Sequence, residues 1–212
     1  MPRFHYFAYG SNLLAERLTA RCPSARVIGA VSVTGWRLVF QAKSFDGSGK
    51  ATMVKGEDGD VVHGRLYEIA VAEREGLDRA EGADRDPPIH VRHDDFVVTA
   101  ADGSTVSDVS VHLAREETVA LPPWDWYRAL IVAGAMQAEL PAADVAALAV
   151  VPALPDVLPK RKTRLEALRI LVGAGYAELA KACGASVPVA PAASTTLDEV
   201  AERAVAEAIS AA

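Results

Sequence analysis

The chain has few cysteines, few aromatic residues and no excess of positive charge. Its 212 residues include only two cysteines, Cys22 and Cys183, which are far apart and form no CxxC pair. This count excludes a disulfide framework and favours reduced, inert thiols. The formal net charge of −6 disfavours binding to nucleic acid or to an anionic membrane, because both partners need clustered positive charge.

Long hydrophobic runs are also missing. The longest run, residues 145–154, contains Pro152 and is much shorter than the roughly 20 residues of a membrane-spanning helix. The first residues lack the apolar core of a secretory signal. Half of the residues are hydrophobic and 24% are charged, which is typical of a globular protein. We therefore expect a cytoplasmic protein with a substantial core.

Strand-like segments dominate the first 113 residues. Runs rich in β-branched and aromatic residues predict strands over residues 4–9, 27–33, 36–42, 51–55, 61–69, 89–100 and 105–113. Hydrophobic spacing predicts helices over residues 13–21, 72–80, 126–139 and 142–149. This pattern favours an α+β fold, a small mixed β-barrel or curved sheet with flanking helices.

The composition changes near Pro152. We expect a β-rich domain over residues 1–155 and a C-terminal helical extension over residues 156–212. The extension contains predicted helices at 163–182 and 197–209, joined by a Pro/Ala/Ser-rich linker at 186–196. Its apolar stripe, which could pack on the parent domain or on a partner subunit in a homodimer, consists of Leu165, Leu168, Ile170 and Leu171.

One turn near the amino terminus joins a strand end, a glycine and a helix start. Its sequence is Tyr9-Gly10-Ser11-Asn12, and Ser11 or Asn12 is expected to cap the helix. Such a junction can point free backbone N–H groups at one spot, which favours a carboxylate or a developing oxyanion. Taken alone, however, the motif fits a plain structural turn better.

A second motif ends the predicted helix at 72–80. The segment Leu77-Asp78-Arg79-Ala80-Glu81-Gly82 places a carboxylate at the helix end. Gly82 is suited to terminate that helix. A single glutamate in such a position is by default a solvated surface residue.

Together, the two segments resemble the gamma-glutamylcyclotransferase family. Residues 6–13 are similar to the family's amino-terminal signature, and residues 77–82 are similar to its catalytic glutamate motif. Residues 59–64 and 127–141 also resemble family segments, and all four occur in the family's order. The resemblance covers residues 4–155.

The resemblance implies an enzyme that cyclises a gamma-glutamyl group to 5-oxoproline and releases the attached amine. It implies no metal, no cofactor and a small gamma-glutamyl compound as the partner. Glu81 is the expected general acid/base, with a pKa raised by desolvation in a barrel interior. The residues expected to bind substrate are Tyr9, Gly10, Ser11, Asn12 and Leu13.

Two histidines occur where related sequences tend to carry tyrosines. We expect His90 and His112 to line the substrate pocket, with simple surface histidines as the alternative. The spacing His90-x-x-His93 invites a metal interpretation. Residues three apart on a strand face opposite sides, however, so the two rings should not converge on one ion.

The resemblance leaves the substrate and one alternative function open. Gamma-glutamyl amino acids, gamma-glutamylamines and gamma-glutamyl-protected biosynthetic intermediates all fit, and a glutathione-specific activity is ranked lower. A non-catalytic module that binds a small carboxylate and uses its tail for protein interaction is the alternative. A Ser11 nucleophile is disfavoured because no Gly-x-Ser-x-Gly elbow surrounds it.

Overall fold

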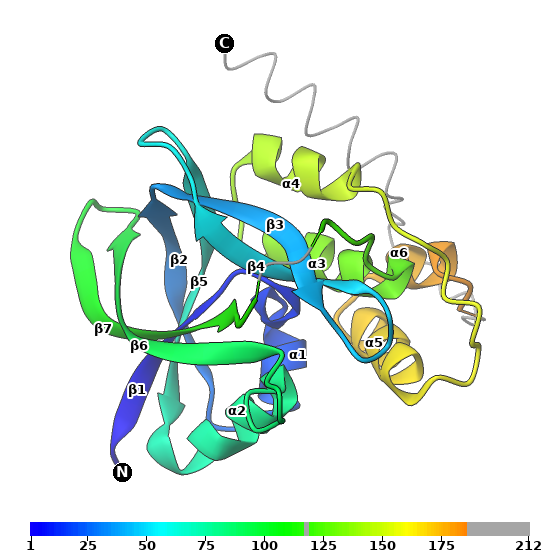
Figure 1. Cartoon of the computed structure of the whole chain (residues 1–212), viewed down its shortest axis with the longest axis horizontal. Helices are drawn as coiled ribbons and strands as arrows, with labels where there is room; N and C mark the ends of the chain where they lie inside the picture. Colours follow the sequence, from blue (N-terminus) through cyan, green and yellow to red (C-terminus); the bar gives the residue numbers. More distant parts are fainter. Residues whose placement is uncertain (117–118, 186–212) are drawn as a thin grey trace.

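Five strands close into a small barrel. In this computed structural model, which describes residues 1–116 and 119–185, the strand order is β1-β5-β2-β6-β7 (Figure 1). The pairs are antiparallel except β1 with β7, whose parallel pairing closes the barrel. These strands are β1 (Arg3–Ala8), β2 (Arg26–Thr34), β5 (Val61–Ala70), β6 (His90–Ala100) and β7 (Thr105–Ala114).

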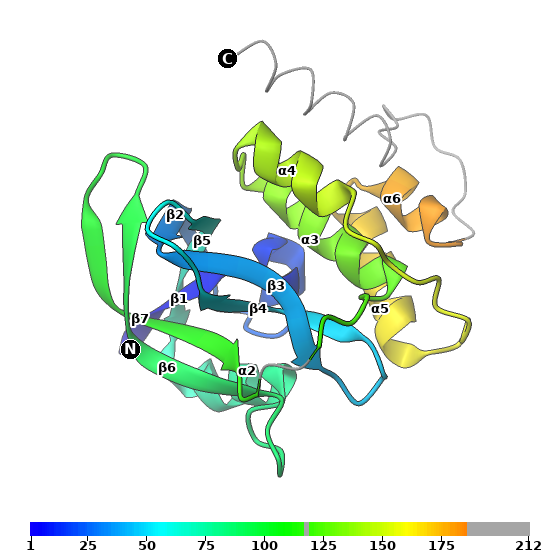
Figure 2. The ribbon, with the colours of Figure 1, turned by 45° about the horizontal axis from the view of Figure 1, so that its top comes forward.

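A separate two-stranded sheet consists of β3 (Trp36–Lys43) and β4 (Gly49–Lys55). This hairpin runs from the barrel toward the helices (Figure 2). Each of the seven strands overlaps one of the predicted strand runs, because alternating β-branched and aromatic residues favour a half-buried pleated backbone.

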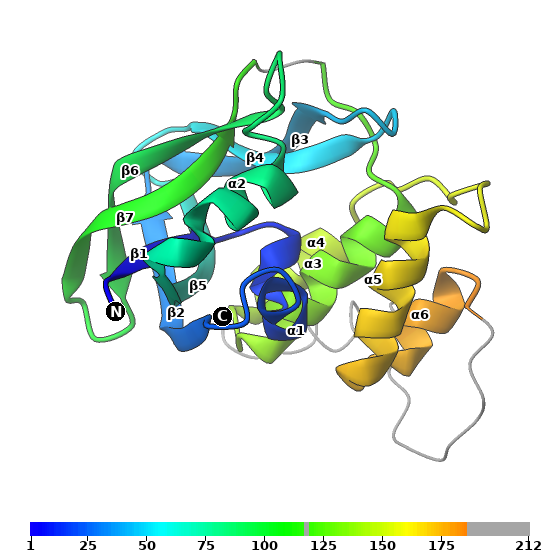
Figure 3. The same cartoon turned by 90° about the horizontal axis from the view of Figure 1, so that it is seen from below.

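Helices cover the barrel on two sides (Figure 3). A short 3-10 helix followed by an α-helix comes after each of β1 and β5. After β1 these are η1 (Ser11–Leu13) and α1 (Ala15–Thr19), and after β5 they are η2 (Val71–Glu73) and α2 (Arg74–Glu81). The remaining helices gather beside the barrel as α3 (Asp125–Gln137), α4 (Ala142–Ala149), α5 (Lys162–Gly173) and α6 (Ala177–Ala182). No helix in residues 1–116 and 119–185 is both long enough and apolar enough to span a membrane.

Two helix predictions need correction. The predicted helix at 13–21 is a 3-10 turn followed by a five-residue α-helix, and neither Ser11 nor Asn12 caps it with its side chain. The predicted helix at 163–182 is broken into α5 and α6, because Gly175 adopts a φ of +90° between them. The predicted linker at 186–196 and helix at 197–209 lie outside the described residues.

The two faces of β1 pack in different hydrophobic clusters, because successive strand residues point to opposite sides. Phe7 lies in the larger cluster with α3, whereas Tyr6 packs in a smaller cluster with Leu18 of α1 and Leu77 of α2. The α1 and α2 helices therefore approach the Tyr6 face of the barrel, where the two sequence motifs meet.

The described part of the extension packs on the rest of the chain. Leu168 and Leu171 of the α5 stripe, with Leu179 of α6, belong to the same buried cluster as α3. The segment before α5 is anchored at Asp156, whose carboxylate accepts hydrogen bonds from Trp126 Nε1 at 2.9 Å and Arg161 Nε at 2.6 Å. The stripe was expected to pack either on the parent domain or on a partner subunit. Leu168 and Leu171 of the stripe pack on the parent domain.

Candidate active site

Helix α2 ends at the predicted glutamate. The Gly82 N–H donates to the Arg79 carbonyl at 3.1 Å, and the Ala83 N–H donates to the Asp78 carbonyl at 2.8 Å. These two bonds make a Schellman motif. Gly82 has a φ of 70°, a conformation that strains residues with a Cβ. Its predicted role as the helix terminator is confirmed, and the motif fixes where the Glu81 side chain leaves the helix.

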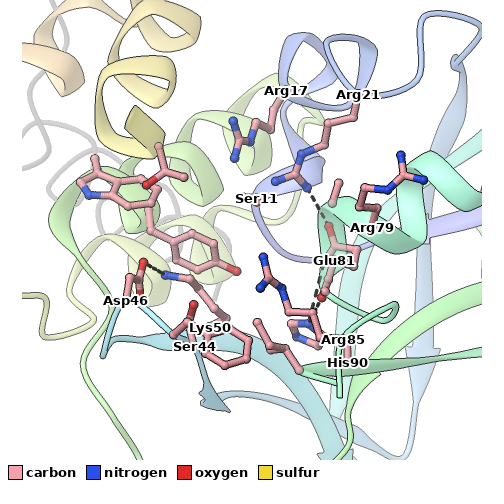
Figure 4. A pocket seen from close by; sticks show the side chains of 17 residues that line it. Ser11, Arg17, Arg21, Ser44, Asp46, Lys50, Arg79, Glu81, Arg85 and His90 are labelled. Carbon is pink, nitrogen blue, oxygen red and sulfur yellow. Dashed lines mark hydrogen bonds and ion pairs between the residues drawn. The ribbon is translucent and has the colours of Figure 1, made fainter. Parts of the chain in front are cut away.

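One oxygen of Glu81 is fully engaged. Oε1 accepts a hydrogen bond from Arg21 Nη1 at 2.7 Å (Figure 4) and another from Asn12 Nδ2 at 2.9 Å. Arg21 also donates to Asn12 Oδ1 at 2.8 Å. The Glu81 side chain is only 17% exposed. Oε2 lies 4.0 Å from His90 Nδ1. The clamp on Oε1 therefore leaves Oε2 available for proton transfer.

The pKa of Glu81 is lowered, not raised as the barrel interior predicted. Burial does raise the pKa, but the Arg21 guanidinium, the two nearby histidines and the Asn12 hydrogen bond together outweigh it. The carboxylate is consequently ionised at neutral pH. The prediction was wrong because it considered desolvation without the charges that the fold gathers around the carboxylate.

The turn after β1 presents free amides, though fewer than predicted. The Leu13 N–H donates to the Gly10 carbonyl at 2.9 Å and closes the 3-10 turn. The amides of Ser11 and Asn12 are the first of this turn and have no acceptor within it. Leu13 itself is 1% exposed and packs in the core. The structure thus brings Ser11 and Asn12, but not Leu13, to the site.

Close packing against α3 fixes this turn. A Cβ on Gly134 would lie 2.4 Å from the Leu14 backbone nitrogen and 2.5 Å from the Leu13 Cβ. A Cβ atom essentially never approaches another non-bonded heavy atom this closely, so only glycine permits the turn to approach the helix. Gly134 is therefore a positioning residue for the site.

His112 is held by a carboxylate. Its Nε2 lies 2.9 Å from Asp78 Oδ1, and Arg92 pairs with the same carboxylate. Burial lowers the pKa of His112, although Glu81 and Asp78 oppose the shift. The ring is therefore neutral at pH 7, and Nε2–H donates to Asp78. His112 Nδ1 is buried without a partner among the described residues, so it presents a free acceptor.

His90 is engaged on both sides. Its Nδ1 lies 3.0 Å from the Glu81 carbonyl oxygen, and its Nε2 lies 3.3 Å from the Ala51 carbonyl oxygen. His90 is buried and His93 is exposed, as strand alternation predicts. Within the ranges that the structure describes, no group of three or more His, Cys, Asp or Glu side chains could hold a metal ion.

These residues surround an inner recess of about 20 Å³, room for roughly one water molecule. A larger outer cavity of about 280 Å³ adjoins it, and both are lined by Ser11, Glu81, His90 and Tyr127. Of the eight predicted site residues, the seven that line the recess are Tyr9, Gly10, Ser11, Asn12, Glu81, His90 and His112.

Sequence reasoning missed several neighbours of these residues. Tyr6 and Tyr127 also line the recess, and burial raises the pKa of both phenols, which keeps them neutral. The Tyr127 hydroxyl accepts a hydrogen bond from the Ala51 N–H at 3.2 Å. Tyr6 and Tyr127 lie in segments that resemble the family and could have been found there, whereas no local pattern marks Arg21.

Comparisons with known proteins agree with this geometry. The family described as "Gamma-glutamyl cyclotransferase, AIG2-like" matches residues 6–128, more than half of the chain. The chain belongs to this family. A "Gamma-glutamylcyclotransferase" of Bos taurus is 31% identical over 143 residues, covering 65% of this chain and 73% of the relative. The Homo sapiens protein of the same name is 30% identical with the same coverage.

A solved structure of a "Gamma-glutamyl cyclotransferase" superposes on the chain with a TM-score of 0.69. It is 26% identical, and the match covers 78% of this chain and 96% of that one. The predicted family and the predicted α+β barrel are both confirmed. The family match includes Glu81, both recess histidines and the first residues of α3.

Proposed function

We propose that this protein is a gamma-glutamyl cyclotransferase. It converts a gamma-glutamyl amino acid or amine to 5-oxoproline and releases the amine. One observation carries the proposal. The ionised Glu81 carboxylate, with Oε2 unclamped, borders the same small recess as the free amides of Ser11 and Asn12.

The recess has room for roughly one water molecule, so it suits the reacting groups of a gamma-glutamyl substrate rather than its whole head. Glu81 Oε2 and His112 Nδ1 are acceptors suited to the α-ammonium group. The amides of Ser11 and Asn12 are donors suited to an anionic oxygen. The α-ammonium group would thus provide the partner that the buried His112 Nδ1 lacks within the described residues.

The reaction needs a proton acceptor, ring closure and a proton donor. Glu81 accepts a proton from the α-ammonium group, and the freed amine attacks the gamma carbonyl carbon. A C–N bond forms, and the backbone amides stabilise the tetrahedral oxyanion. The bond to the leaving amine then breaks as Glu81 returns the proton to that nitrogen, and the ring nitrogen passes its second proton to the freed amine, which departs as an ammonium ion. Both reacting groups belong to one molecule, so ring closure has the advantage of proximity.

The substitution Glu81→Gln tests this assignment. Release of 5-oxoproline from a panel of gamma-glutamyl amino acids and amines should fall by about 10²- to 10⁴-fold. Glu75→Gln is a matched control, because Glu75 is an exposed glutamate on the same helix, and it should retain the wild-type rate. An undiminished rate for Glu81→Gln would refute the assignment. No turnover by the wild type, combined with tight binding of these compounds, would favour the non-catalytic module.

We further propose residues 1–155 as the catalytic unit and residues 156–212 as an extension. A cytoplasmic location is supported by the two free, buried cysteines, Cys22 and Cys183. The homodimer stays a prediction that light scattering would test. The protein is expected to act on a small gamma-glutamyl compound without nucleic acid, membrane, metal or cofactor.

A further inference from the structure

The proposed reaction transfers two protons, and the Glu81 carboxylate can hold only one of them at a time. The α-ammonium nitrogen of the substrate carries three protons, whereas the ring nitrogen of 5-oxoproline keeps one. The leaving amine gains two protons, because it departs as an ammonium ion at neutral pH. While Glu81 carries the first proton, the second needs another acceptor close to the same nitrogen.

The recess contains a second free base. His112 is 3% exposed and lines the recess together with Glu81. Its Nδ1 has no hydrogen-bond partner in the part of the chain that the structure describes. The recess has room for roughly one water molecule, and an ammonium group is of similar size. An amine nitrogen in the recess would therefore lie beside both the Glu81 and the His112 side chains.

The other titratable side chains that line the recess cannot act as this acceptor. Both ring nitrogens of His90 face carbonyl oxygens, at 3.0 Å and 3.3 Å. Burial raises the pKa of the three phenols, which therefore stay protonated, namely Tyr6, Tyr9 and Tyr127. Among the described residues of the recess, His112 is thus the free base that remains beside Glu81.

Asp78 of α2 determines which nitrogen of His112 is free. The Nε2–H of His112 donates to Asp78 Oδ1 at 2.9 Å. The other oxygen of Asp78 pairs with Arg92, whose Nε lies 3.1 Å from Asp94 Oδ2. Arg92 lies opposite His112 in the register of β6 and β7. These contacts hold the Asp78 carboxylate against Nε2, so the lone pair is on Nδ1.

The charges around the His112 ring suit it to gain and lose a proton. Burial lowers the pKa of His112. Glu81 and Asp78, both on α2, oppose this shift, and His90 on β6 adds to it. The Tyr6 ring of β1 packs edge-on against the imidazole, with the centroids 5.8 Å apart. The ring is therefore neutral at pH 7, and an imidazolium formed during the reaction would lie beside the Asp78 carboxylate.

We propose that His112 is a second catalytic base, whose Nδ1 takes the second proton from the ring-forming nitrogen and delivers it to the leaving amine. Asp78 acts through His112 as a positioning residue. The inference rests on the proposed function and deepens its mechanism.

The protons and charges balance over the reaction. Glu81 removes one proton from the α-ammonium group, and the amine attacks the gamma carbonyl carbon. The attacking nitrogen, now bonded to that carbon and positively charged, gives its second proton to His112 Nδ1. Glu81 protonates the leaving nitrogen as its bond to carbon breaks. His112 then protonates the freed amine, and both side chains return to their starting states.

The substitution His112→Gln removes the base but keeps an amide N–H that can donate to Asp78. We expect kcat for release of 5-oxoproline, measured on the best substrate of the panel, to fall by about 10²-fold or more. His93→Gln is the matched control, because His93 is an exposed histidine on β6, and it should keep the wild-type kcat. The Tm of each variant reports whether it is folded.

The pH–rate profile separates a catalytic role from a structural one. Both bases must be unprotonated in the free enzyme, so kcat/KM of the wild type should fall through two ionisations as the pH drops. The His112 ionisation lies below the usual histidine value of about 6.5. His112→Gln should retain only the Glu81 ionisation. Asp78→Asn removes a charge that favours the imidazolium, so it should move the His112 ionisation to lower pH. A structural role would lower the rate without removing an ionisation.

Nitrogen NMR of the wild type tests the tautomer without any variant, so it holds even if His112→Gln does not fold. The histidines are labelled with ¹⁵N, and the His112 signal is assigned by its loss from a histidine variant or by its contacts to Tyr6. We expect a protonated Nε2 and an unprotonated Nδ1 at pH 7. A proton on Nδ1 at that pH would overturn the inference.

Failure of the second base and failure of the proposed function give different results. Wild-type kcat with both ionisations intact in a folded His112→Gln variant would overturn the role of His112 and leave the cyclotransferase standing. Absence of 5-oxoproline release by the wild type would refute the cyclotransferase and the second base together.

Discussion

The ion pair of Arg21 with Glu81 sets the acid side of the proposed pH–rate profile. Because Glu81 must be ionised to accept a proton, kcat/KM should fall as the pH drops through its lowered pKa. Arg21 is the largest of the influences that lower this pKa. The substitution Arg21→Met should therefore move the acid limb to higher pH. Release of 5-oxoproline, measured from pH 4 to pH 8, would show the shift.

The same substitution should destabilise the fold. The two side chains are 16% and 17% exposed, and removing one partner of a buried pair costs about 3 kcal/mol or more. For a chain of this size, that loss corresponds to a fall in Tm of roughly 6–12 °C. The double variant Arg21→Met/Glu81→Gln removes both charges and should recover most of the loss, which separates stability from chemistry.

The sign of the pH dependence of stability follows from the lowered pKa. A carboxyl group with a lower pKa in the folded state stabilises the protein fully above the unfolded value of about 4.3. That contribution is lost as the pH falls through the folded-state value. The stability gap between wild type and Arg21→Met should therefore narrow in acid. The reasoning would be refuted if an active Arg21→Met enzyme kept the acid limb at the same pH as the wild type and Arg21→Lys gave the same limb.

Three further predictions follow from the packing. Gly134→Ala should lower the free energy of unfolding by about 1–3 kcal/mol and reduce turnover, because the added Cβ has no space. Gly173→Ala changes a helical glycine with open space around it and should raise the free energy of unfolding by about 0.5–1 kcal/mol. Equal shifts in Tm for the two variants would contradict this prediction. Asp78→Asn should lower kcat/KM about tenfold through its bond to His112, and an unchanged pH–rate profile would argue against it. Asp156→Asn should lower Tm at pH 7, but less as the pH falls through the lowered pKa of this carboxyl; melts from pH 3 to pH 7 would show this.

Local structure was largely determined by local sequence. The β-branched runs predicted each strand found in the described residues, and the hairpin of β6 and β7 turns at Asp102-Gly103, where glycine adopts a φ of 83°. The glycine after Glu81 ended the helix as expected. Each of these features depends on the conformational preferences of a few adjacent residues, so a single sequence contains the necessary information.

The electrostatics of the site depended on tertiary structure alone. Arg21 and Glu81 are 60 residues apart in sequence, and no spacing rule pairs them. Their contact reversed the expected direction of the Glu81 pKa shift. The sequence by itself determined the strands, the family and the residues that could do the chemistry. Only the closed barrel, with α1 and α2 packed on one face, decided which charges meet, because charge interactions depend on distance through space rather than along the chain.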